Sequence, residues 1–573
     1  MGRKDFNVIS KVDSTNYAME LCNVLKGRFN DVDFSSKAIV LSFLVLKLQD
    51  NGRIVNCSLD NILSDELFTK EEKEIIYRHC ADCFDIAISM INRFTSDVII
   101  SFVLFGSFNS NINKEYDNCF TPESIIRLGS KMLDITTNDR VLDLCSGQGG
   151  FMVHNYDIME DFTSLDINYK ANDCSYLKMI LLSKEFNIKL NNALTYIEDE
   201  KFDKIFANYP YMLKVGIDEY RSLLSNELNL SGLTKSSSDW LFNASIIRNL
   251  SRSGKAIGIV TNGTTLNVID REIRKNFIES GFIEAVISLP ERMFDFTTIP
   301  VTMIVFSYEN TKVSMIDATN ICTRSRRNNT FDDKDINQII SCIGVESEIS
   351  TVKDISEFNN SDYILNPKKY LSTPTVENGI ELASLVKSIS RGASLKASEL
   401  DKLSSEVVTG YKYLSLSNIK NNILNYEEDI MNLREIPSNY MKYQLKENMI
   451  ILSKVGKPTF KSAIVHLEGD ITLIPSSNFI VLEIDTEKAN PHYIQAFLSS
   501  EKGLSLLESS TSGSVIPIIS ADSLKKILIP YVSLEEQNVI ANKYAANLDN
   551  IKILQKQLKK AVSRVANLFN EEV

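Results

Sequence analysis

The chain has 573 residues, of which 44% are hydrophobic and 24% charged, a composition typical of a globular protein with roughly three or four domains. Its net charge of −12 argues against a nucleic-acid partner, although local basic stretches decide such contacts. Nine scattered cysteines, the lack of a signal peptide and the lack of an apolar run of roughly 18 residues predict a reduced, cytoplasmic protein that does not cross a membrane.

The first part of the chain has apolar side chains at helical spacing and no catalytic constellation, so a helical N-terminal domain is expected over residues 1–110. Cys80 and Cys83 form a CxxC pair there, but no second pair follows at zinc-ligand spacing, and no metal site is expected. Phe120 and Thr121, the latter followed by proline, then open an amphipathic helix. Local physics alone makes this segment a capped helix.

A glycine-rich loop follows the short apolar run over residues 141–144, which predicts a buried strand, a tight turn and a helix. Glycines let a ligand approach the backbone, and the helix N-terminus offers free N–H groups. The next predicted strand, over residues 162–165, ends at Asp166, whose carboxylate could accept hydrogen bonds from both hydroxyls of a ribose. Taken alone, such a loop need not bind any ligand, and an aspartate at a strand end is equally well the cap of a turn. Together, the loop and Asp166 favour a nucleoside site.

A second apolar run, over residues 202–207, ends at the tetrapeptide Asn208-Tyr209-Pro210-Tyr211. In a doubly wound sheet the carboxyl ends of both strands lie at one rim, so a cofactor and a planar substrate would meet there. Taken alone, the tetrapeptide is equally well a Tyr-Pro turn. The polar stretch between Tyr211 and Ser238 is expected to be a loop near the substrate.

These motifs resemble those of the amino-type DNA methyltransferases that methylate adenine at N6, and most closely those of the modification subunits of type I restriction systems. The resemblance covers residues 120–306. The loop has the form Asp143-x-x-x-Gly147-x-Gly149 rather than GxGxxG, and residues 285–300 resemble the family's strand–LPxxxF–loop–IP segment. The resemblance implies a doubly wound, Rossmann-like methyltransferase core with a mixed sheet over residues 111–345.

The resemblance also implies S-adenosylmethionine as the cofactor. The residues that it assigns to cofactor binding are Phe120, Thr121, Asp143, Ser146, Gly147, Gly149, Asp166 and Asn192. Asn192 departs from the family, which usually has an aspartate near the adenine amine of the cofactor. Its amide oxygen could still accept that hydrogen bond, although more weakly than a carboxylate.

The tetrapeptide corresponds to the family's catalytic Asn-Pro-Pro-aromatic motif, which assigns catalysis to Asn208, Tyr209, Pro210 and Tyr211. The exocyclic amine of adenine is a poor nucleophile because its lone pair is delocalised into the ring. The Asn208 side-chain oxygen and the main-chain carbonyl of Tyr209 would localise that lone pair, and Tyr211 would stack on a base flipped out of the duplex. Tyr209 replaces a proline, whose loss removes a constraint on the turn.

Beyond the core, residues 346–377 lose periodicity and are expected to be a linker. Residues 378–545 alternate strands and short helices and resemble one half of a type I specificity subunit, a single DNA target-recognition domain. Residues 546–573 carry apolar side chains at heptad-like spacing. This segment is either a spacer helix that pairs with another helix or a helix that packs on its own domain.

The expected protein is therefore multidomain α/β, with a helical N-terminal domain, a methyltransferase core and a C-terminal α+β domain that ends in a long helix. It would methylate adenine N6 in duplex DNA, within a restriction-modification or related system. Its expected partners are double-stranded DNA and, through the last helix, a second copy or a further specificity or restriction subunit. The alternatives are an enzyme that acts on RNA or protein glutamine, which parallel substrate assays would reveal, and an inactive DNA-binding protein that would bind no cofactor.

Overall fold

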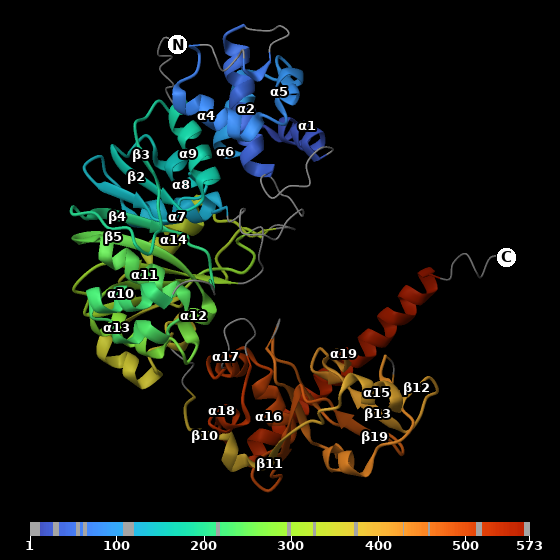
Figure 1. The fold of residues 1–573 in the computed structure, drawn as a ribbon. Coiled ribbons are helices and arrows are strands. Elements are labelled where there is room, and N and C mark those ends of the chain that lie inside the picture. The colour runs from blue at the N-terminus through green and yellow to red at the C-terminus, as the bar shows by residue number, and fades with distance from the viewer. Residues whose placement is uncertain are drawn as a thin grey trace, which may run out of the picture. The chain divides into compact units, whose positions relative to one another are not determined.

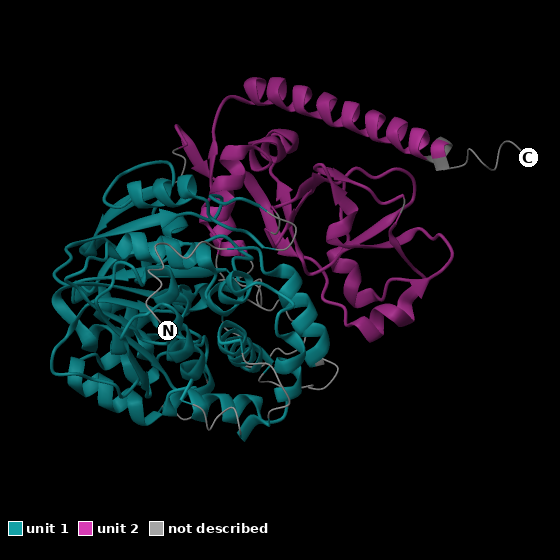
Figure 2. Ribbon diagram, turned by 90° about the horizontal axis from the view of Figure 1, so that it is seen from above, with its two compact units in different colours: residues 1–371 teal, residues 372–573 magenta. Residues whose placement is uncertain are grey.

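The structure is a computed structural model that describes residues 12–26, 34–52, 58–60, 66–106, 120–213, 218–294, 300–324, 328–371, 376–427, 429–456, 459–511 and 518–566. The chain divides into two compact units, residues 1–371 and 372–573 (Figure 2). Among the described residues, none of the helices is both long enough and apolar enough to span a bilayer.

Unit 1 begins with a group of helices, drawn in blue in Figure 1: α1 (Thr15–Lys26), α2 (Phe34–Asp50), α4 (Lys70–Cys80), α5 (Phe84–Met90) and α6 (Ser96–Phe105). Almost every side chain of α2 is buried, so this helix forms the centre of the group. Thr69 and Glu72 form a capping box that begins α4, which satisfies two of its free N–H groups.

The rest of unit 1 is built on one nine-stranded sheet in the order β3-β2-β1-β4-β5-β7-β6-β8-β9. Its strands are β1 (Arg140–Asp143), β2 (Asp161–Asp166), β3 (Asn187–Leu190), β4 (Phe202–Ala207), β5 (Leu250–Thr261), β6 (Ile283–Ser288), β7 (Val301–Phe306), β8 (Lys312–Asp317) and β9 (Ser350–Asp354). The first five in sheet order pair in parallel, whereas β7 runs antiparallel to both of its neighbours. β7 and the second half of β5 are nearly continuous buried runs, as expected for strands that helices cover on both faces.

Helices cover the sheet on both faces and enclose two hydrophobic cores (Figure 1). One core contains α7 (Glu123–Leu133), α8 (Gly150–Asn155), α9 (Tyr169–Leu181) and α14 (Asp333–Ser341), and it continues into the N-terminal helices. The other contains α10 (Asp218–Leu228), α11 (Ser238–Asn249) and α13 (Arg271–Glu279). Together, these layers confirm the expected doubly wound core with a mixed sheet.

Two expectations about loops are wrong. Residues 346–377 are not simply a linker, because they contribute β9 and the 3-10 helices η3 (Ile355–Ser361) and η4 (Pro367–Lys369) to unit 1. Their polar sequence gave no sign of a strand because β9 lies at the edge of the sheet, where it pairs antiparallel with β8 alone. A strand in this position needs few apolar side chains. The stretch after Tyr211 contains α10 and the 3-10 helix η2 (Ser231–Lys235).

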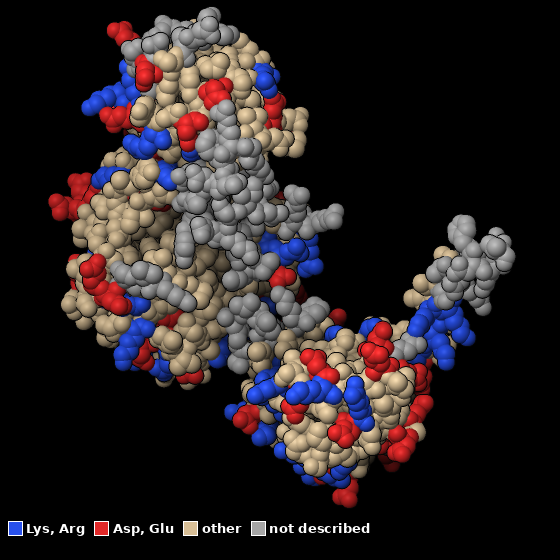
Figure 3. All heavy atoms as spheres, turned by 45° about the vertical axis from the view of Figure 1, so that its right-hand side comes forward, with Lys and Arg blue, Asp and Glu red and all other residues tan. Residues whose placement is uncertain are grey.

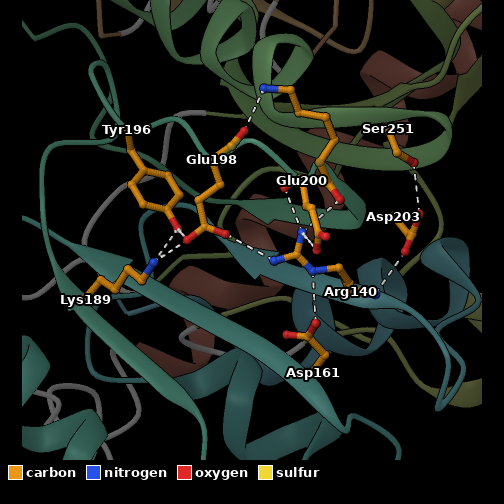
Figure 4. A network of polar contacts seen from close by, with 9 residues as sticks. Arg140, Asp161, Lys189, Tyr196, Glu198, Glu200, Asp203 and Ser251 are labelled. Carbon is orange, nitrogen blue, oxygen red and sulfur yellow. Dashed lines mark hydrogen bonds and ion pairs between the residues drawn. The ribbon is translucent and has the colours of Figure 1, made fainter.

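A network of charged side chains connects the first residues of β1 and β2 with β3 (Figure 4). Arg140 donates to Asp161 of β2 at 3.0 Å and to Glu198 at 3.1 Å. Glu198 also accepts from Lys189 of β3, which pairs with Leu165 of β2, and from the Tyr196 hydroxyl. Arg140 and Glu198 therefore link three neighbouring strands.

Unit 2 has two four-stranded sheets. One is β11 (Val386–Arg391), β20 (Phe479–Ile484), β17 (Ile450–Ser453) and β18 (Ser462–Ile464), and the other is β12 (Ser404–Ser405), β16 (Met431–Leu433), β13 (Tyr411–Leu414) and β19 (Thr472–Pro475). Two strand pairs accompany them, β10 (Gly379–Glu381) with β21 (Leu528–Pro530) and β14 (Ile419–Lys420) with β15 (Ile423–Leu424). The helices are α15 (Ala397–Leu403), α16 (Pro491–Leu498), α17 (Glu501–Ser509), α18 (Ala521–Lys525) and α19 (Leu534–Ala566).

Helix α19 is longer than the expected spacer and begins at Leu534, within the segment assigned to the recognition domain. Its first part packs on α16, and its later part extends from unit 2 (Figure 2). Acidic and basic side chains are interspersed on the face of unit 2 drawn in Figure 3. Near the far end of α19 the exposed charges are lysines, at positions 556, 559 and 560.

Lys178 of α9 is a charged side chain inside the core of unit 1. Its ammonium is fully buried, hydrogen-bonds to none of the described residues and lies 5.7 Å from the centre of the Phe120 ring. Burial lowers the pKa of Lys178 to about 8, although Cys174 partly opposes the shift. A base with a lowered pKa in the folded state destabilises the fold at any pH below that value.

We therefore predict that Lys178→Met raises the free energy of unfolding at pH 7 by about 2–3 kcal/mol, because it removes a buried and uncompensated charge. The gain should shrink as the pH rises from about 8 towards the ordinary lysine value of about 10.5, where both states lose the proton. Urea unfolding at several pH values measures this change. The exposed Lys131→Met is the control, and an equal effect of pH on both variants would contradict the assignment.

Candidate active site

A pocket of about 670 Å³ in the described part of unit 1 opens at the carboxyl ends of β1, β2, β3 and β4. This volume is in the usual range for a small-molecule site. Its lining includes Phe120, Thr121, Asp143, Ser146, Gly147, Asp166, Asn192, Asn208 and Pro210. All of the predicted site residues except Gly149, Tyr209 and Tyr211 therefore meet around one cavity.

The glycine loop wraps the cavity and is held by β2. Gly147 has a φ of +52°, and its N–H donates a hydrogen bond to Asp166 Oδ2 at 2.8 Å. The loop is therefore hydrogen-bonded directly to the residue that is expected to bind the ribose. Ser164 of β2 donates to the Ser146 hydroxyl at 2.7 Å. Gly149, with a φ of +78°, faces away from the cavity, where a Cβ atom would lie 2.9 Å from the hydroxyl oxygen of Ser175. Gly149 therefore serves helix packing rather than ligand contact.

Two carboxylates stand beside each other in the cavity. Asp143 is buried, and burial together with repulsion from Asp166 raises the pKa of Asp143 well above its ordinary value, whereas a hydrogen bond from the Cys145 backbone opposes the shift. Asp166 is only half-buried, so the cost of removing a carboxylate from water falls mainly on Asp143. A positive group in the cavity would relieve the repulsion between the two carboxylates.

The Asn192 amide makes one hydrogen bond at each end. Its Oδ1 accepts from the Leu194 N–H at 2.9 Å, and because a backbone N–H can only donate, the oxygen must face that group. Its Nδ2 donates to the Tyr220 hydroxyl at 3.2 Å, and both side chains line the cavity. One lone pair of the Asn192 oxygen therefore remains for a further donor, as the expected contact with the cofactor amine requires.

Asn208, 7% exposed, is held from two sides. Its Nδ2 donates to the Thr121 hydroxyl at 2.8 Å, and its Oδ1 accepts from the Tyr211 hydroxyl at 2.7 Å. Thr121 therefore contacts the predicted catalytic amide directly, in addition to lining the cavity. Since Thr121 accepts one N–H, the amide oxygen of Asn208 is directed to the other side, where Tyr211 lies.

The side chain of Tyr209 points into the core rather than into the cavity. Its ring is 2% exposed and stacks on Phe242, with ring centroids 4.7 Å apart. Its hydroxyl donates to Asn243 Oδ1 at 2.6 Å. Tyr209 can therefore contribute only its main chain to the cavity, whereas Pro210 lines the cavity directly.

Several lining residues were not predicted, among them Gln148, Ile167, Tyr220 and Phe242. Gln148 and Ile167 directly neighbour predicted positions and could have been inferred from them. Tyr220 belongs to α10, in the stretch expected to be a loop, and no local signal pointed to it. Phe242 lies on α11 far along the chain, and only the packing of α11 behind Tyr209 brings it to the cavity.

Two family models match the chain. Residues 101–379 match the family described as N-6 DNA Methylase, and residues 379–564 match the Type I restriction modification DNA specificity domain. The second match covers most of unit 2, including most of α19.

Curated relatives are similar to the chain over about half its length. The Type I restriction enzyme MpnII methylase subunit of Mycoplasma pneumoniae is 25% identical over 322 residues, which cover 50% of this chain and 59% of that protein. The MjaIX methylase subunit of Methanocaldococcus jannaschii is 23% identical over 339 residues, which cover 53% and 60%. The chain thus spans about three fifths of the length of these relatives.

Among solved structures, the methyltransferase subunit of a type I restriction-modification system from Streptococcus thermophilus aligns with a TM-score of 0.46 and 16% identity, over 62% of this chain and 99% of that one. The family expected from the sequence motifs is confirmed by the two family matches. The chain therefore combines an N-6 DNA methylase region, residues 101–379, with a type I restriction modification DNA specificity domain, residues 379–564.

Proposed function

We propose that the protein transfers a methyl group from S-adenosylmethionine to the N6 amine of adenine in a defined sequence of duplex DNA, within a restriction-modification or related system. The observation that carries the proposal is that one cavity joins the predicted ribose ligand Asp166 to the predicted catalytic Asn208. Family membership supports the reaction, and the specificity domain supports DNA as the substrate.

The residues present fit the cofactor. A carboxylate at the end of β2 suits the ribose, and the purine would continue towards β3, between Ile167, Leu194 and Phe242. The methionine part would lie towards Phe120 and the glycine loop. When bound, the cofactor supplies a methyl group on a positively charged sulfur, which the paired carboxylates Asp143 and Asp166 favour electrostatically.

Asn208 would then act on the target amine. Its Oδ1 and the Tyr209 carbonyl accept the two N–H bonds of that amine, which localises the nitrogen lone pair towards the methyl group. Because the leaving group is neutral once the methyl has moved, no strong base is needed before transfer. Positioning and fixed dipoles supply most of the rate. The adenine would reach this site by leaving the duplex. The hydrogen bond from the Tyr211 hydroxyl to Asn208 would then break, and the Tyr211 ring would stack on the adenine.

Helix α19 supports a partner, either a second copy or a further specificity or restriction subunit. Leu554, Leu558, Val562 and Val565 lie on it at spacings of three and four residues and are 60–70% exposed. Such a stripe is typical of the seam between two paired helices. One recognition domain would read one half of a target, and pairing through this stripe would bring a second recognition domain to the other half.

Asn208→Ala should lower the transfer rate by about 100-fold or more, because it removes an acceptor that acts in the transition state. Incorporation of labelled methyl groups into unmethylated genomic DNA, with RNA and protein as parallel substrates, measures this rate. Cofactor affinity should remain within a factor of about two, since the cofactor does not depend on that acceptor. Equal rates in the variant and the wild type would remove Asn208 from the mechanism.

Asp166→Ala should weaken the binding of S-adenosylhomocysteine by about tenfold or more, since two charge-assisted hydrogen bonds are lost. Asp166→Asn is the matched variant, because its remaining oxygen can still accept from the Gly147 N–H and hold the loop. Its affinity should lie between those of Asp166→Ala and the wild type. Isothermal titration calorimetry measures all three, and unchanged affinity in both variants would argue against the ribose assignment.

A chain that ends at Leu371, the last residue of unit 1, should keep cofactor binding and lose sequence preference. The cavity is lined entirely by unit 1, and the specificity domain begins after it. Calorimetry with S-adenosylhomocysteine and modification-sensitive sequencing of DNA from expressing cells test the two halves of this prediction. Methylation of the same sites by the truncated chain would show that unit 1 reads the target.

A further inference from the structure

Helix α11 packs directly behind the loop that carries Asn208. Asp239 in its first turn and Asn243 one turn later lie on the same side of the helix, because residues four apart are neighbours on a helix surface. Both side chains are completely buried, and neither lines the cavity. They contact the loop on either side of Pro210.

Asp239 holds the loop after the tetrapeptide. Its Oδ1 accepts from the Met212 N–H at 3.0 Å, and its Oδ2 accepts from the Thr264 hydroxyl at 2.8 Å. Met212 has a φ of +54°, a left-handed conformation that costs free energy for a residue with a side chain. A bond to a buried carboxylate is among the strongest available to a backbone N–H, and it stabilises this conformation.

Asn243 holds the loop before Pro210. Its Oδ1 accepts from the Tyr209 hydroxyl, while the neighbouring Phe242 stacks on the Tyr209 ring at an interplanar angle of 10°. A proline at this position would restrict the backbone through its ring but would have no hydroxyl to bond. The contacts of the Tyr209 side chain with α11 therefore restrain the loop, where a proline would restrain it through its own ring.

We propose that Asp239 and Asn243 are positioning residues for methyl transfer, which hold the Asn208 side chain and the Tyr209 carbonyl at a fixed separation. The inference rests on the proposed function, in which these two acceptors share one amine. An error of about 1 Å in such a placement can cost about 100-fold in rate. Since neither Asp239 nor Asn243 lines the cavity, their loss should affect transfer and leave cofactor binding intact.

The test uses the full chain with Asp239→Ala, the conservative Asp239→Asn, and Tyr209→Phe, which keeps the stacked ring and removes only the bond to Asn243. The measurements are the single-turnover rate of methyl transfer to unmethylated genomic DNA, the affinity for S-adenosylhomocysteine, and amide hydrogen exchange of the peptide 208–213. Asn249→Ala is the control, because Asn249 is a buried amide of the same helix that bonds to Tyr196 and Ser245 instead of the loop.

We expect Asp239→Ala and Tyr209→Phe to lower the transfer rate by about ten- to 100-fold and to speed exchange in the peptide, with affinity changed less than about twofold. Asp239→Asn should recover part of the rate, since its oxygen still accepts from Met212. The control should lower the melting temperature without changing the rate.

Unchanged rate and exchange in Asp239→Ala and Tyr209→Phe would overturn the proposal, as would a parallel loss of rate and cofactor affinity. If the wild type transfers no methyl group, the proposed function fails by itself. Hydrogen exchange then decides the inference alone: faster exchange supports the anchoring by α11, and unchanged exchange refutes it.

Discussion

The parallel pairing of β3, β2, β1 and β4 is the constraint on which the site depends. Parallel strands end at the same rim, so the residues that follow each strand meet there although they are far apart in sequence. The hydrogen bonds of Arg140 to Asp161 and Glu198 begin at the opposite ends of β1 and β2 and add contacts between these strands. Register matters because a shift of one residue would turn Asp143 and Asp166 away from the cavity.

The N-terminal helices share a continuous core with one face of the sheet. Side chains of α2 and α6 belong to the same hydrophobic cluster as those of α7, α8 and α9. Burial on this scale explains how the chain tolerates an ammonium such as Lys178 inside the core, because the surrounding apolar contacts offset its cost. The helices are therefore part of the structure that supports the cofactor side of the cavity.

The polar contacts of Asn208 connect the two halves of the cavity. Thr121, from the segment before β1, orients the amide, and Tyr211 occupies the oxygen that the proposed substrate needs. An incoming amine would replace the Tyr211 hydroxyl with a bond of the same kind, so the exchange of partners costs little free energy. The ring that is released is then free to stack on the base. The buried polar atoms of the tetrapeptide are thus paired with Thr121, with Asn243 and with each other.

Local signals in the sequence were sufficient for much of this arrangement. The strand over residues 141–144, the glycine turn, Asp166 and Asn208 were predictable because apolar runs, glycines and strand-end polar residues follow from short-range physics. The helical beginning also followed from such patterns, whereas the family followed from the resemblance of the motifs to those of known methyltransferases. The contacts of Asn192 did not, because its identity alone does not say that its amide lies between the Leu194 N–H and the Tyr220 hydroxyl.

By itself, the sequence determined that β1, β2 and β4 exist, in what order they occur, and which polar residues lie at their carboxyl ends. Only the tertiary structure decided what lies behind those residues: that Tyr209 is anchored by Asn243, that Asp239 holds Met212, and that the polar stretch 346–377 closes the sheet with β9. The physical reason is that these contacts join segments tens of residues apart. Their free energy depends on how helices and strands pack, which no local pattern records.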